Sequence, residues 1–62
     1  MNISNAREKM GISQDELAKR LKVTQGAISQ WESGRTRPRS DMLVHLSEVL
    51  GVTVDELLRG GE

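Results

Sequence analysis

One short pattern recurs three times along the chain, in the segments ISQDEL, VTQGAI and VTVDEL. In each, a Ser or Thr follows an apolar residue, and another apolar residue stands four positions after the Ser or Thr. Such a hydroxyl caps a helix by accepting a hydrogen bond from a first-turn N–H, and the two apolar residues pack together as a hydrophobic staple. The pattern predicts helices that begin at about Ser13, Thr24 and Thr53. A Glu three residues after Ser13 and after Thr53 predicts a full capping box at these two starts.

Two further segments have helical periodicity that ends at a glycine. Apolar residues recur from Ile3 to Met10 before Gly11, which predicts a helix over about residues 2–10. We expect another helix from a Ser40 cap to Gly51, with an apolar stripe made of Met42, Leu43, Leu46, Val49 and Leu50. No alternating pattern coincides with a hairpin signal, so no strand is predicted. The 62 residues are thus expected to form one all-α domain of five short helices, spanning 1–62.

Composition excludes several classes of site. The chain has no Cys and one His, so neither disulfides nor a zinc site is expected, and His45 is assigned a structural or surface role. No nucleophile, base and orienting group form a recognisable catalytic pattern, and no cofactor or small-molecule effector is expected. No signal peptide or long apolar run is found, which predicts a soluble, cytoplasmic protein that does not enter a membrane.

Charge is unevenly distributed although the formal net charge is zero. Residues 7–39 contain eight basic and four acidic side chains, whereas residues 40–62 contain five acidic and one basic. One end of the molecule is therefore suited to face phosphate while the other end avoids it.

The predicted helix that begins at Thr24 has two unlike sides. At 100° per residue, Ala27, Ile28 and Trp31 fall on one side, and Trp31 is expected in the core. The opposite side carries a row of small and amide residues, here called the polar row: Gln25, Gly26, Ser29 and Gln30. A polar helix face is often only solvated, but Lys and Glu are the usual residues there. Amides and hydroxyls both donate and accept, as reading base edges in a DNA major groove requires.

The neighbouring segments favour the DNA-reading interpretation. A helix over residues 13–21 precedes the polar row, and the tight turn at Lys22-Val23 makes the pair a helix-turn-helix. Residues 33–39, SGRTRPR, form a basic loop after the second helix; alone, such a loop is usually just solvated. We expect base reading by Gln25, Gly26, Ser29 and Gln30. We expect phosphate binding by Gln14, Thr24, Arg35, Thr36, Arg37 and Arg39.

The stretch SQDELAKRLKVTQGAISQWESGRTRP resembles the helix-turn-helix of the lambdoid phage repressor and Cro family, also called XRE-type regulators. LSEVLGVTVDELL resembles the family's two closing helices, so the resemblance covers nearly the whole chain. It implies a compact five-helix, lambda-repressor-like fold, in which Gln14 and the basic loop bind phosphates and Gln25 and Gln30 read bases. Two residues depart from the pattern. Gly26 stands where relatives often have a base-reading side chain, and Lys22 stands where Gly is usual, at a cost on the order of 1 kcal/mol if left-handed.

The resemblance implies a Cro-like repressor that binds a palindromic operator in double-stranded DNA as a homodimer. No second, effector-binding domain is expected in 62 residues, and the expected dimer interface consists of Val44, Val52, Val54 and Leu58. An alternative is a protein-interaction module, such as an antitoxin or anti-repressor, although such a module would not need the basic loop. Glu32 is left open between an exposed charge and a partner for an arginine of the loop.

Overall fold

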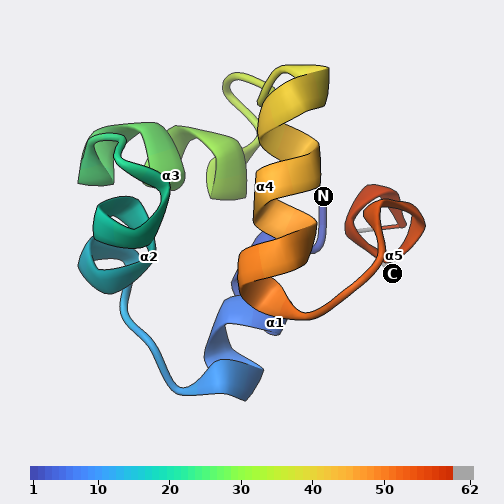
Figure 1. The fold of residues 1–62 in the computed structure, drawn as a ribbon. Helices are drawn as coiled ribbons and strands as arrows, with labels where there is room; N and C mark the ends of the chain where they lie inside the picture. Colours follow the sequence, from blue (N-terminus) through green and yellow to red (C-terminus); the bar gives the residue numbers. More distant parts are fainter. Residues whose placement is uncertain (60–62) are drawn as a thin grey trace.

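The computed structural model describes residues 1–59 as five α-helices with no strand among them (Figure 1). The helices are α1 (Ile3–Met10), α2 (Gln14–Leu21), α3 (Gln25–Ser33), α4 (Ser40–Leu50) and α5 (Val54–Leu58). Figure 1 shows α3 lying across one end of α2, with α4 between these two helices and α5. The predicted all-α architecture is confirmed. Glu62, counted in the predicted acidic end, lies outside the described residues.

Hydroxyl caps start three of the helices, as predicted. The Thr24 side chain accepts from the Ala27 N–H at 3.1 Å, and Thr53 forms a complete capping box with Glu56. The hydroxyl of Ser13 accepts from the Glu16 N–H at 3.0 Å, but the Glu16 carboxylate accepts from Arg20 at 3.1 Å instead of returning to the cap. The capping box predicted at Ser13 is therefore only half formed.

The start of α4 differs from the prediction. Arg39, not Ser40, is its N-cap residue, and no side chain caps the helix there. The Arg39 backbone is extended, with φ −68° and ψ 164°, and its carbonyl accepts from the Leu43 N–H at 2.9 Å. The first helical bond thus forms one residue earlier than predicted, so Ser40 lies inside the first turn.

Each helix contributes one side chain with no exposed surface to a single core: Ile3, Leu17, Ile28, Leu46 and Leu57. The short α5 is also held by a backbone bond of 2.8 Å from the Asn2 N–H to the Leu57 carbonyl. Trp31 is half-buried against this core, which confirms its predicted inward side only in part. Met10, the last residue of α1, is 41% exposed, so it does not extend the buried apolar side that Ile3 and Ala6 form on this helix.

The turn between α2 and α3 sets the geometry of the helix pair. Lys22 has a φ of 60°, and it is the one non-glycine residue within 1–59 with positive φ. Its N–H donates to the Lys19 carbonyl at 3.2 Å, and the Val23 N–H donates to the Ala18 carbonyl at 3.0 Å. These bonds end α2 abruptly and let Thr24 cap α3 two residues later. The left-handed conformation places the Lys22 Cβ close to backbone, which is unfavourable for an L-residue.

Replacing Lys22 with Gly should therefore stabilise the domain. Relief of the left-handed strain exceeds the extra freedom that Gly adds to the unfolded chain, so we expect a gain of about 0.5–1 kcal/mol in the free energy of unfolding. Urea denaturation followed by circular dichroism measures it. Lys22→Ala is the matched control, because it removes the same charge and keeps the Cβ. Equal stabilisation by both variants would assign the effect to charge and contradict the strain.

Candidate DNA-binding surface

The polar row lies on the outward side of α3. All four of its residues are exposed, whereas Ile28 on the opposite side is fully buried. Together with Ser33 and Arg35, the polar row lines a shallow hollow of about 480 Å³. The inward side of α3 therefore docks the helix, and the polar row is left free for contacts outside the domain.

A chain of hydrogen bonds runs from α1 to the polar row. Arg7 on α1 donates to both carboxylate oxygens of Glu32 on α3, from Nε at 2.8 Å and from Nη2 at 3.4 Å. Gln14, at the start of α2, donates from Nε2 to Glu32 Oε1 at 2.8 Å. Gln25 in turn donates from Nε2 to Gln14 Oε1 at 2.6 Å. Three helices thus meet through side chains at one edge of the polar row.

The direction of every bond in this chain follows from the charge on Glu32. A carboxylate can only accept, so Gln14 must point its amide nitrogen toward it and its amide oxygen away. That oxygen then requires the amide nitrogen of Gln25. Gln25 keeps its own Oε1 and one Nε2 hydrogen free, in an orientation that cannot flip without losing a bond. The amide of a base-reading candidate is thus oriented before any ligand arrives.

Glu32 has neither of the two roles left open by the sequence. Its side chain is 10% exposed and that of Arg7 is 13% exposed, so the pair is largely shielded. The hydrogen bond to Glu32 raises the pKa of Arg7 above its usual value. Arg7 also donates from Nη1 to the Ile12 carbonyl at 2.9 Å, which ties the α1–α2 connection to the same cluster. No local signal marks this pair, because its members stand 25 residues apart.

The basic loop leaves α3 beside the polar row. The Gln30 carbonyl accepts from the N–H groups of Arg35 at 3.0 Å and Thr36 at 3.5 Å, so the end of α3 and the loop form one unit. The Thr36 hydroxyl also donates to the Gln30 side chain at 3.5 Å. Gln30 is thus linked to a residue predicted to bind phosphate, much as Gln25 is linked to Gln14.

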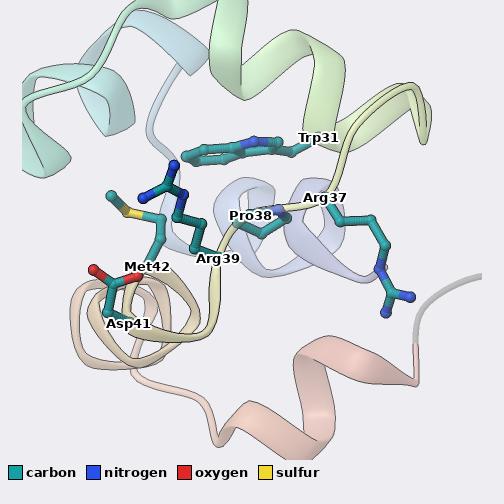
Figure 2. Close-up of a pocket in the computed structure, with 6 residues that line it drawn as sticks. All are labelled: Trp31, Arg37, Pro38, Arg39, Asp41 and Met42. Atoms are coloured by element: carbon teal, nitrogen blue, oxygen red, sulfur yellow. The ribbon is translucent and has the colours of Figure 1, made fainter.

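The two arginines nearest α4 point in different directions. Figure 2 shows Arg39 extending toward Trp31 and Met42, and Arg37 extending away from them. With Pro38 and Asp41, these residues line a hollow of about 420 Å³. Arg37 is therefore placed for a contact outside the domain, whereas Arg39 partly covers the half-buried Trp31.

Local ion pairs distinguish several surface cations from the arginines of the basic loop. Lys19, Arg20 and Arg59 each form an ion pair with a carboxylate four residues earlier, at 3.5, 3.1 and 2.9 Å. Among the ion pairs of residues 1–59, none involves Arg35, Arg37 or Arg39. The loop arginines are therefore available to an anion, whereas Lys19, Arg20 and Arg59 are locally neutralised by their carboxylate partners.

The residues expected at a dimer interface differ in exposure. Val44 and Leu58 are 49% and 47% exposed, while Val52 and Val54 are half-buried. Val52 packs against the core, so less of its side chain is available to a second copy than the sequence alone indicates. The exposed apolar part of this set is Val44 on α4 and Leu58 on α5.

Within residues 1–59, no helix has the length and apolar character needed to cross a membrane.

The structure has two short helices joined by a tight turn, and polar groups lie on the outer side of the second helix. The arginines that follow it form no ion pair within residues 1–59. These features define a helix-turn-helix DNA-binding domain. The chain belongs to the helix-turn-helix family, whose model matches residues 3–57, and within it to the XRE-type regulators.

Three relatives illustrate this membership. The chain is 45% identical over 51 residues to the HTH-type transcriptional activator BcrR of Enterococcus faecalis, covering 82% of this chain and 25% of that protein. It is 43% identical over 54 residues to repressor protein C2 of Salmonella phage P22, covering 87% of this chain and 25% of that protein. It is 52% identical over 40 residues to the 26 kDa repressor protein of Escherichia phage HK022, covering 64% of this chain and 17% of that protein. The chain thus spans a quarter or less of these three proteins. No solved structure gives a significant match.

Replacing Arg7 with Met should destabilise the domain by roughly 2 kcal/mol, between the losses typical of exposed and of fully buried pairs. The loss arises because the shielded Glu32 carboxylate keeps its charge without its main partner. Thermal or urea denaturation of Arg7→Met, Glu32→Gln and the double variant gives the coupling between the two residues. We expect the double variant to lose clearly less free energy of unfolding than the two single variants lose together. Additive losses would show that the pair contributes no specific interaction.

Proposed function

We propose that the domain binds double-stranded DNA sequence-specifically as a homodimer on a palindromic operator, and that it represses transcription by occupying that operator, as a Cro-like repressor does. The observation that carries this proposal is the oriented amide of Gln25 in the exposed polar row, next to loop arginines that have no acidic partner among residues 1–59. A partner-holding module, the alternative function, would need neither feature.

Base reading is assigned first to Gln25. Its free Oε1 accepts from adenine N6 while its remaining Nε2 hydrogen donates to adenine N7, a bidentate contact worth about 1–3 kcal/mol of discrimination. Guanine presents two acceptors at the same positions. Gln25 has one amide hydrogen already donated to Gln14, so it cannot donate twice to guanine without breaking that bond. The hydrogen-bond chain therefore favours adenine over guanine.

The remaining contacts position the domain. Arg35, Thr36 and Arg37 bind phosphates on one side of the groove, and Gln14 and Thr24 bind them near the start of the helix pair. Gln14 has one Nε2 hydrogen left after its bond to Glu32, which is sufficient for one phosphate oxygen. Gln30 and Ser29 read a neighbouring base pair from further along α3. Arg39 is a weaker candidate for phosphate binding than Arg37, because its side chain extends toward Trp31.

The homodimer interface is assigned to the exposed residues Val44 and Leu58 and to the half-buried Val54. They belong to the acidic C-terminal third, which is electrostatically unsuited to contact phosphate. Two copies related by a two-fold axis place their recognition helices about one helical turn apart, roughly 34 Å, on a palindromic site. The interface is small, so DNA binding and dimerisation are expected to reinforce each other.

Replacing Gln25 with Ala should abolish the preference at one base pair of each half-site. Affinity for random DNA and thermal stability should stay nearly unchanged, because Gln25 is exposed and, among residues 1–59, its side chain bonds to Gln14 alone. The measurement is a binding profile across all four bases at each position of a duplex selected from random DNA. A uniform loss of affinity with the profile intact would make Gln25 a positioning residue.

Arg37→Ala is the matched control for this experiment. A phosphate contact carries no base information, so this variant should lose affinity for selected and random DNA alike. The slope of log affinity against log salt should become shallower by about 1 for each copy in the dimer. The two variants thus separate base reading from charge.

Replacing Leu58 with Asp should lower affinity for a full palindromic site far more than for a half-site, because a carboxylate on the interface opposes association of the two copies. Electrophoretic mobility shifts on both duplexes measure this. Met10→Asp is the control, since Met10 is also an exposed apolar residue at the last position of its helix. Equal losses on full and half sites would place the interface elsewhere.

A further inference from the structure

Gly26, the second residue of α3, has no conformational reason to be a glycine. The glycines with positive φ within residues 1–59 are Gly11, Gly34 and Gly51, each of which ends a helix. Gly26 has ordinary helical backbone. A glycine in a helix is unfavourable compared with alanine, because it gains more freedom in the unfolded chain.

Packing does not require this glycine either. A Cβ built on Gly26 meets one atom, the Thr24 hydroxyl oxygen, at 3.9 Å, which is an ordinary van der Waals contact. A methyl group at this position would therefore be accepted by the protein and would favour the helix. The only thing that the methyl group would change is the outward surface, in the middle of the polar row.

The missing side chain leaves a notch on that surface. Gln25 stands on one side of it, oriented by Gln14, and Ser29 and Gln30 stand on the other, within the same shallow hollow. The floor of the notch is the Gly26 Cα, which is apolar and has neither donor nor acceptor. Polar walls around an apolar floor suit a small apolar group attached to a polar edge.

We propose that Gly26 is a specificity-determining position, and that its notch accepts the C5 methyl group of a thymine adjacent to the base pair read by Gln25. This inference rests on the proposed DNA-binding function. The thymine methyl is the one apolar group that a base pair presents in the major groove, and cytosine has only hydrogen at that carbon. Gly26 thus selects thymine by leaving room for its methyl group.

The test removes methyl groups from the DNA and adds one to the protein. A duplex selected by the wild-type protein from random DNA is resynthesised with uracil replacing one thymine at a time, in both half-sites. Wild type should lose about fourfold in affinity per half-site at one position, the effect of burying a single methyl group. Uracil at the remaining positions should have little effect.

Gly26→Ala should raise the melting temperature by about 2–8 °C and yet weaken binding to the thymine duplex by tenfold or more. On the uracil duplex it should bind as well as on the thymine duplex or better, because its own methyl fills the vacated space. Asn5→Ala, an exposed change on α1, controls for stability alone and should leave binding unchanged.

The outcomes separate this inference from the proposed function. If the selection enriches no sequence, the sequence-specific function fails and the notch has no ligand. If a sequence is enriched but no uracil replacement lowers wild-type affinity, Gly26 does not read a methyl group, whatever the variant does. Equal losses by Gly26→Ala on thymine and uracil duplexes would also overturn the inference, since they would indicate a simple clash with DNA.

Discussion

The carboxylate of Glu32 fixes the direction of the hydrogen bonds that join α1, α2 and the polar row. It receives the guanidinium of Arg7 from α1 and the amide of Gln14 from α2, while it belongs to α3 itself. Shielded ion pairs often add little net stability, because removing two charges from water offsets their attraction. The more specific consequence is directional. A fixed acceptor at this point orients two successive glutamine amides, and the second of them faces out of the domain.

The fold provides a rigid base for this arrangement with few residues. Five fully buried side chains, one from each helix, meet in one core, and hydroxyl caps start α2, α3 and α5. A domain of this size has little stability to spare. Two residues nevertheless depart from what stability favours: Lys22, which is strained, and Gly26, a helical glycine that packing does not require. Lys22 lies in the turn that sets the angle between α2 and α3, and Gly26 lies in the polar row.

The two ends of the molecule differ in charge and in apolar exposure. Arginines that form no ion pair in the described part of the chain follow α3, whereas Val44 and Leu58 are exposed on the acidic C-terminal third. Coulombic attraction to phosphate acts on the first region and is absent from the second. In the proposed function, the first region contacts DNA and the second region contacts a second copy of the chain.

Local interactions account for what the sequence by itself determined. Ser13, Thr24 and Thr53 mark helix starts because a cap bonds within three residues, and the polar row follows from helical periodicity alone. The start at Ser40 was misplaced by one residue, since a hydroxyl can enter the first turn as easily as cap it. Tertiary structure alone decided that Glu32 pairs with Arg7 and that Gln14 joins this pair to Gln25. Those outcomes depend on how distant helices meet, so the orientation of Gln25 was not visible in any short stretch of the chain.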